Sequence, residues 1–214
     1  MDLTDGGNDY VNPFLDFRMR NYGKAGFDRT HNFSLNFLYD LPKFSRYWNN
    51  GFSRGALDGW EVTGITRFIS GRPLGFSYSF IQSTDITGTS GVAGVDSRVI
   101  LIGDPNLPKS ERSVDRHFRT EVVRPPERSN FGIGNAAKDA IRGPGIHNWD
   151  LSLFKNMKWG RESARRIQLR GEFYNAFNHA QFDGVDTVAR FDAQGRQANA
   201  RFGQYTSARD GRRV

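Results

Sequence analysis

Two histidines are the residues of this chain whose type and spacing come closest to a metal site. His147 and His179 stand near the same end of two segments that we expect to pair as a hairpin. Imidazole is a common zinc ligand, but zinc sites in proteins use three or four protein ligands. No third ligand is evident from the sequence, and no HExxH spacing occurs. The pattern favours two histidines at the rim of a sheet, and we expect no metal and no cofactor.

A glycine-rich segment offers a second kind of chemistry. Residues 132–137, GIGNAA, match the G-x-G-x-x-A pattern of dinucleotide-binding sites. That pattern needs a strand before it and a helix after it, whereas RPPER precedes this segment and RGPG follows it. A turn is the better interpretation. The chain has no cysteine, which excludes disulfides and thiolate chemistry, and no serine stands in a nucleophile-elbow context. We expect no enzyme.

The net charge of +7, from 30 Lys+Arg and 23 Asp+Glu, fits three kinds of partner. These are nucleic acid, acidic lipid headgroups and an anionic solute. The basic residues are scattered, and they are dense only at 161–166 and 209–213. The first cluster suits a solvated hairpin turn better than a stripe that follows phosphates. We therefore expect no nucleic-acid partner.

Alternation of apolar and polar residues marks the elements that position these side chains. In residues 29–42, the apolar positions Phe33, Leu35 and Phe37 alternate with asparagine and serine. A period of two over ten residues indicates a β-strand with one apolar face. Residues 60–69 repeat the pattern less cleanly, because Ile65 and Ile69 fall on the polar side.

The clearest hairpin joins residues 148–155 to residues 166–178 through a turn around Gly160. With that turn, Asp150 lies opposite Arg170, and Leu151 lies opposite Leu169. This register pairs unlike charges on one face and apolar residues on the other. A shift by two residues would place Asp150 opposite Glu172, which repulsion disfavours.

Strand length and loop asymmetry favour a membrane barrel over a soluble β-sandwich. No stretch approaches 18 consecutive apolar residues, which excludes a spanning helix. Sandwich strands also alternate, but they usually run about five or six residues, whereas a tilted bilayer crossing takes about 9–11. The aromatic residues near the predicted strand ends suit a membrane interface: Tyr39, Trp60, Trp149 and Trp159. The fold class is therefore all-β, an antiparallel transmembrane barrel portion.

The two faces of such a wall meet different surroundings. We expect the apolar set to face lipid: Phe33, Leu35, Phe37, Trp149, Leu151, Leu153, Ile167, Leu169 and Phe173. We expect the polar set to face the lumen: Arg67, Asp150, Arg166, Arg170 and Glu172. The polar set could touch a solute or a plug. Charge pairing that only keeps the wall hydrated is the simpler interpretation.

The connections between the predicted strands alternate in length. Weaker strands are expected at 14–22 and 201–207, while residues 78–145 form a connection far beyond ordinary loop length. Outer-membrane barrels have short turns on one side and long loops facing outside the cell. We predict that 78–145 is a long extracellular loop, with short strands inside it near 97–102.

Six segments together resemble the closing strands of TonB-dependent receptors, in particular those of the Oar-like branch. The segments are FDRTHNF at 27–33 with YDLP at 39–42, GWEVTGI at 59–65, SGRP at 70–73, RGPGIHNWDLSLFKN at 142–156, EFYNAFNH at 172–179 and FGQYTSARD at 202–210. They follow the family's order and extend over nearly the whole chain. The resemblance implies the cell outer membrane and a barrel of about 22 strands around a plug.

The resemblance also implies partners. These are outer-membrane lipid, the remainder of the barrel with its plug, a TonB-type energy-coupling protein, and a small solute or glycan. No plug segment and no export signal is found in residues 1–214, and the aromatic-terminated last strand of the family is not reached. We therefore expect a C-terminal barrel portion that serves solute uptake. The alternative is a soluble or surface-attached β-domain that binds a glycan or a protein.

Overall fold

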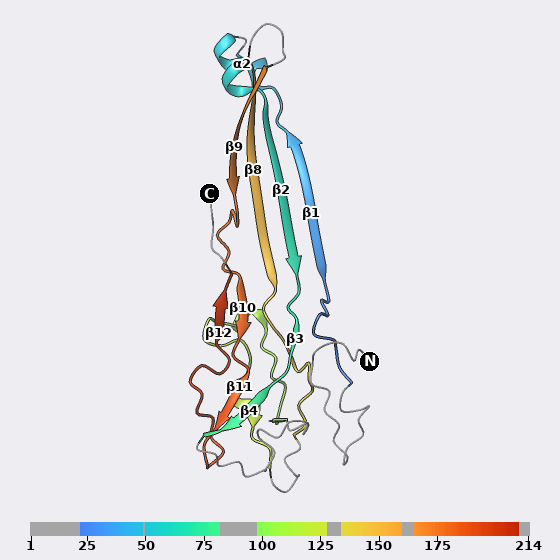
Figure 1. Ribbon diagram of the computed structural model, residues 1–214, viewed down its shortest axis with the longest axis vertical. Coiled ribbons are helices and arrows are strands. Elements are labelled where there is room, and N and C mark those ends of the chain that lie inside the picture. Colours follow the sequence, from blue (N-terminus) through green and yellow to red (C-terminus); the bar gives the residue numbers. More distant parts are fainter. Residues whose placement is uncertain (1–21, 49, 82–97, 128–133, 160–164, 210–214) are drawn as a thin grey trace. The chain divides into compact units, whose positions relative to one another are not determined.

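The computed structural model describes residues 22–48, 50–81, 98–127, 134–159 and 165–209 (Figure 1). The chain divides into two compact units, and each is built from segments far apart in the sequence. The sheet unit consists of His31–Ile69, Ile146–Gln181 and Arg209–Val214. The core unit consists of Met1–Thr30, Ser70–Gly145 and Phe182–Ala208. The connection between the second and third strands of the sheet thus belongs to a different unit from the strands themselves.

Four long antiparallel strands form the sheet unit, in the order β1-β2-β8-β9 (Figure 1). They span Asn32–Asp40 (β1), Trp60–Ile69 (β2), Ile146–Trp159 (β8) and Arg165–Phe173 (β9). Their lengths are 9, 10, 14 and 9 residues, which meet the length of about 9–11 residues that a bilayer crossing needs. The four predicted strands and the antiparallel all-β class are confirmed, although β9 ends at Phe173 and not at 178.

The register between β8 and β9 differs from the predicted one by four residues. Phe154 lies opposite Arg170, and Lys155 lies opposite Leu169, so the predicted pairs of Asp150 with Arg170 and Leu151 with Leu169 are wrong. An even shift keeps every side chain on its predicted face.

The cause of the different register is the length of β8. This strand continues to Trp159 instead of ending at 155, and β9 begins at Arg165. The longer ladder adds an apolar pair, Met157 opposite Ile167, and a 2.7 Å hydrogen bond from Gln168 Nε2 to Asn156 Oδ1. These contacts outweigh a single exposed charge pair, which contributes little.

The connection between β1 and β2, residues 41–59, forms what we call the cap at one end of the sheet unit (Figure 1). It contains the 3-10 helix η1 (Phe44–Arg46) and the short helix α2 (Gly51–Leu57). Helix α2 begins with a capping box in which Asn50 Oδ1 accepts a hydrogen bond from Ser53 N (2.7 Å).

The core unit is made of short strands. They are β3 (Pro73–Leu74), β4 (Ser77–Phe80), β5 (Ile100–Leu101), β6 (Val123–Arg124), β7 (Ile141–Arg142), β10 (Phe182–Val185), β11 (Val188–Phe191) and β12 (Tyr205–Ala208), with the 3-10 helices η3 (Lys109–Glu111) and η4 (Thr120–Val122). Strands β3 and β7, β5 and β6, and β10 and β12 pair antiparallel, while β4 and β11 pair in parallel.

An apolar core holds these short strands together. Three of its phenylalanines pack edge to face, with the Phe118 ring centroid 5.0 Å from that of Phe76 and 5.1 Å from that of Phe202. The buried members of this core come from all parts of the unit: Phe76, Val99, Phe118, Val123, Ala136, Ile141, Ala189, Phe191 and Phe202. Edge-to-face aromatic pairs add about 0.5–1.5 kcal/mol each beyond the burial of their area.

The long connection at 78–145 is therefore structured in its described parts. It contributes β5, β6, β7, η3, η4 and the end of β4. The strand predicted near 97–102 is confirmed as β5, and the one predicted at 201–207 is confirmed as β12, which begins at Tyr205. Most of the strand predicted at 14–22 lies outside the described residues. The location of 78–145 outside the cell stays a prediction.

Candidate functional site

One face of the sheet unit is apolar across all four strands. Phe37, Gly64, Leu151 and Phe173 stand in one row, and neighbouring rows have the same character because side chains alternate along a strand. The register puts all of the residues that we expect to face lipid on this side: Phe33, Leu35, Phe37, Trp149, Leu151, Leu153, Ile167, Leu169 and Phe173. Several are open, with 53% of Phe33 and 59% of Leu169 exposed.

Burial follows opposite patterns in the two units. Within the described residues, every buried apolar side chain belongs to the core unit. The buried side chains of the sheet unit are all polar: Ser53, Thr66, Lys155, Asn175 and Gln181. A sheet that buries no apolar side chain lacks the main favourable contribution to folding in water. Contact of its apolar face with lipid would supply that contribution.

Polar atoms on the apolar face are hydrogen-bonded within the sheet unit. The Thr66 hydroxyl donates to the carbonyl of Asn148 (3.0 Å), and Lys155 Nζ donates to the carbonyl of Ala56 (3.1 Å). Both of these side chains are almost fully buried. A polar group without a partner in lipid costs several kcal/mol, so this internal pairing suits an apolar environment.

Gly64 is required where three strands pack on this face. A Cβ built on Gly64 would stand 2.5 Å from the Phe37 ring and 2.8 Å from Leu151 Cδ2. Both distances are far below van der Waals contact. The missing side chain lets Phe37 and Leu151, from the two neighbouring strands, close over the backbone of β2.

The opposite face of the sheet unit is polar. It carries the predicted lumen-facing residues: Arg67, Asp150, Arg166, Arg170 and Glu172. Arg170 forms an ion pair with Glu172 on the same strand and lies 5.1 Å from the centre of the Phe154 ring on β8. Asp150 Oδ1 accepts a hydrogen bond from Asn175 N (2.9 Å). Three of the five residues are thus engaged with one another or with neighbours inside the sheet unit, and whether this face meets solute stays a prediction.

The two candidate metal-ligating histidines do lie together. The ring centroids of His147 and His179 are 4.7 Å apart. His147 also packs 4.5 Å from the Phe68 ring, and its Nε2 accepts a hydrogen bond from Trp149 Nε1 (3.3 Å). No cluster of three or more His, Cys, Asp or Glu side chains that could hold a metal occurs in the part of the chain that the structure describes. The two histidines belong to a cluster of aromatic rings at one end of the sheet unit. At this end, β2 leads into Ser70 and Gly145 leads into β8.

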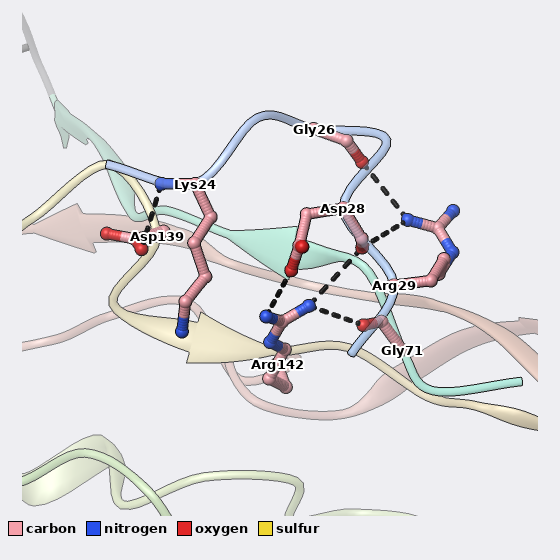
Figure 2. Close-up of polar contacts among 7 residues, drawn as sticks. All are labelled: Lys24, Gly26, Asp28, Arg29, Gly71, Asp139 and Arg142. Carbon is pink, nitrogen blue, oxygen red and sulfur yellow. Dashed lines mark hydrogen bonds and ion pairs between the residues drawn. The ribbon is translucent and has the colours of Figure 1, made fainter. Parts of the chain in front are cut away.

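Three of the motif segments meet at one point of the core unit, which we call the Arg142 node (Figure 2). The Arg142 guanidinium forms an ion pair with Asp28 and donates to the carbonyl oxygens of Asp28 (3.3 Å) and Gly71 (3.1 Å). Nearby, Lys24 N donates to Asp139 Oδ2 (3.1 Å). The node fixes the segment that precedes β1 against the segments that follow β2 and precede β8.

A glycine pair completes the node. A Cβ on Gly71 would stand only 1.8 Å from the carbonyl oxygen of Gly143, so the SGRP and RGPG segments can approach this closely only with glycine at 71. The carbonyl of Gly71 is one of the acceptors for Arg142. Gly71 therefore serves both the close approach to the Gly143 backbone and the hydrogen bond from the Arg142 guanidinium.

His117 is a buried polar residue that the sequence pattern does not reveal. Its side chain is 1% exposed. Its Nε2 lies 2.7 Å from the carbonyl oxygen of Arg142, and its Nδ1 lies 2.9 Å from the Tyr205 hydroxyl. A carbonyl only accepts, so Nε2 carries the proton and Nδ1 accepts from Tyr205. Burial lowers the pKa of His117 and raises the pKa of Tyr205. No periodicity or short motif surrounds His117, because its partners lie 25 and 88 residues away.

The segment GFSRG at 51–55 fits the Gly-x-Ser-x-Gly pattern of serine hydrolases, against the expectation that no serine stands in a nucleophile-elbow context. The structure shows Ser53 in the first turn of α2, where its Oγ contacts Asn50 Oδ1 (2.8 Å) and the carbonyl of Trp48. Ser53 is buried, and α2 does not follow a strand. This is the geometry of a helix cap.

A pocket of 410 Å³ opens in the core unit, beside η4 and β6. Its lining includes Glu121, Arg124 and Arg196. Glu121 pairs with Arg116 (2.6 Å), and Arg196 pairs with Asp192 (2.9 Å). The volume falls in the range of about 300–1,000 Å³ that suits small ligands. No sequence motif marks this pocket, because its two sides come from residues more than seventy positions apart.

The described helices include none that is long and apolar enough to cross a membrane. Comparison with known proteins gave no match among curated proteins and none among solved structures. The model of the family described as "Outer membrane beta barrel domain" matches residues 1–214. This match agrees with the antiparallel sheet and its apolar face. The chain is accordingly a member of the outer membrane beta barrel domain family and is located in the outer membrane.

Proposed function

We propose that the chain forms part of the wall of a TonB-dependent outer-membrane receptor of the Oar-like kind, which takes up a small solute or a glycan. The observation that carries the proposal is the apolar face of the sheet unit. This face extends across all four strands and is partly exposed, while the buried side chains of the described sheet unit are polar. Such a sheet suits a wall between lipid and a polar lumen.

The Arg142 node supports the narrower assignment. The segments FDRTHNF, SGRP and RGPG, which carry part of the resemblance to TonB-dependent receptors, contribute Asp28, Gly71 and Arg142 to a single set of contacts (Figure 2). Because residues of three separate motifs contact one another, this part of the fold needs the three motifs together. The proposal gives the chain no enzymatic role. Its partners are outer-membrane lipid, the rest of the barrel with its plug, and a TonB-type energy-coupling protein.

Cysteine substitution along β8 tests the wall, and the absence of native cysteine makes the labelling specific. In the complete protein in outer membranes, we expect a membrane-impermeant thiol reagent to label Ser152→Cys and to leave Leu153→Cys unlabelled. These neighbours point to opposite faces. Equal labelling of both positions would contradict a lipid-facing wall.

Uptake measurements test the receptor role separately. A strain without the protein should lose energy-dependent uptake of one member of a panel of labelled iron chelates, vitamins and oligosaccharides. A protonophore, or loss of the energy-coupling protein, should have the same effect on the parent strain. Uptake that persists under both treatments would argue for a passive pore instead.

A further inference from the structure

The cap at residues 41–59 is held rigidly on the sheet unit. Lys155 Nζ, from β8, donates to the carbonyl oxygens of Ala56 (3.1 Å) and Asp58, and Trp60 Nε1 donates to that of Ala56 (2.9 Å). The Lys155 ammonium also lies 5.1 Å from the centre of the Trp60 ring. A cation at the carbonyl end of a helix is favourable. Two side chains of the sheet thus hold the end of α2.

Further contacts join the beginning of the cap to its end and the end of the cap to β8. The Asp58 carboxylate accepts hydrogen bonds from Ser45 N (3.0 Å) and Ser45 Oγ (2.6 Å), and these bonds lower the pKa of Asp58. Gly59 adopts a positive φ of 76°, where its carbonyl accepts a hydrogen bond from Asn156 N (2.8 Å). The directions in which the cap presents its remaining side chains are therefore set by the fold.

Aromatic side chains point outward from this rigid cap. Phe52 is 85% exposed, Tyr47 77% and Trp48 64%. Rings of this size are normally buried in a core or an interface. Three exposed rings on one short, well-anchored connection favour a partner that covers them.

The charges of the cap identify the partner. Lys43, Arg46 and Arg54 are basic, and Asp58 is the one acidic residue of the cap. The Asp58 carboxylate is turned inward to Ser45, so the outward charge is positive. Aromatic rings and basic side chains together favour the headgroup layer of a membrane with anionic lipid.

We propose that the cap lies in the phospholipid headgroup layer on the periplasmic side, with Phe52, Trp48 and Tyr47 inserted among the lipids and with Lys43 and Arg46 at their phosphates. The side follows from the connection between β8 and β9, which has only five residues because β8 ends at Trp159 and β9 begins at Arg165, at the same end of the sheet as the cap. Short turns of outer-membrane barrels face the periplasm. This proposal rests on the proposed wall, because it places the cap at the end of that wall's apolar face.

Spin labels on single cysteines test this placement in the complete protein, reconstituted in phosphatidylcholine vesicles with and without phosphatidylglycerol. The sites are Phe52→Cys in the cap, Leu169→Cys on the apolar face and Lys109→Cys in η3 of the core unit. We expect the accessibility to oxygen, relative to a water-soluble nickel complex, to be severalfold higher at 52 and 169 than at 109. We expect phosphatidylglycerol to raise it further at 52, and Lys43→Gln with Arg46→Gln to remove that increase.

The control sites separate failure of this proposal from failure of the wall. A nickel-accessible label at 169 would reject the wall and the cap placement together. A nickel-accessible label at 52 with a lipid-exposed label at 169 would overturn the cap placement alone. A label at 52 that is shielded from both reagents would mean that protein covers the cap, and dependence on added lipopolysaccharide would move the cap to the other leaflet. Either result, or indifference to phosphatidylglycerol, overturns the proposal.

Discussion

At the scale of single residues, burial keeps His117 in its neutral form, with Nδ1 accepting a hydrogen bond from the Tyr205 hydroxyl and Nε2 donating to the carbonyl of Arg142. Burial lowers its pKa below the ordinary 6.5. Between those two pKa values, the unfolded chain binds a proton that the folded core unit does not bind. The contribution of His117 to the free energy of unfolding is therefore fully present above about pH 6.5. It falls as the pH drops toward the pKa of the folded state, by up to about 1.4 kcal/mol per pH unit.

Hydrogen exchange can measure this loss. Peptides from 98–127 should exchange faster, after correction for intrinsic rates, when the pH falls from about 7.5 to about 5.5. His117→Gln can still donate to the Arg142 carbonyl and accept from Tyr205, but it does not titrate. That variant should lose the pH response, and a response equal to the parent's would assign the effect to another group.

At the scale of elements, the two glycines of the apolar face make a matched pair. A Cβ on Gly64 would stand 2.5 Å from Phe37, whereas a Cβ on Gly171 would meet only Phe173, at 3.7 Å. We expect Gly64→Val to destabilise the sheet by about 1–3 kcal/mol through overpacking, and Gly171→Val to have little effect. Urea unfolding in lipid vesicles would show the difference, and equal effects of the two substitutions would mean that Phe37 moves aside freely.

The long strands follow from the sequence because their signal is local. Phe33, Leu35 and Phe37 alternate with polar residues, and the faces of the sheet follow directly from that period. The register of β8 and β9 does not follow, because an even shift satisfies both faces equally well. The observed register is distinguished by its longer ladder, which places Met157 opposite Ile167 and adds the hydrogen bond from Gln168 to Asn156.

Little of the core unit could be predicted from the sequence. Its strands have only two to four residues, too short for a period to emerge. The Arg142 node joins Asp28 to a residue 114 positions away, and His117 meets Tyr205 across 88 positions. Contacts of that range are visible in a sequence only when each motif is already known to belong with the others, as the resemblance to TonB-dependent receptors suggested.

At the scale of the whole molecule, family membership and the two-faced sheet predict how charge is tolerated. Leu153→Arg places a cation on the apolar face, which costs about 2–4 kcal/mol near the middle of the bilayer. Ser152→Arg places the same cation on the polar face, opposite Glu172. We expect much less folded protein in outer membranes for Leu153→Arg and nearly normal amounts for Ser152→Arg, measured by the gel mobility of unheated samples. Comparable losses for both would contradict the assignment of the faces.

The inverted burial of the sheet unit also bears on how the protein is made. The core unit has an apolar interior of its own, whereas the described part of the sheet unit buries none of its apolar side chains. Before insertion, the strands have no aqueous state that shelters Phe33, Leu35 and Leu169. We therefore expect those side chains to need a chaperone that covers them while the chain travels to the membrane. We expect the sheet to fold in the same step that inserts it, at a speed set by the assembly machinery of the outer membrane and by the lipid that receives the strands.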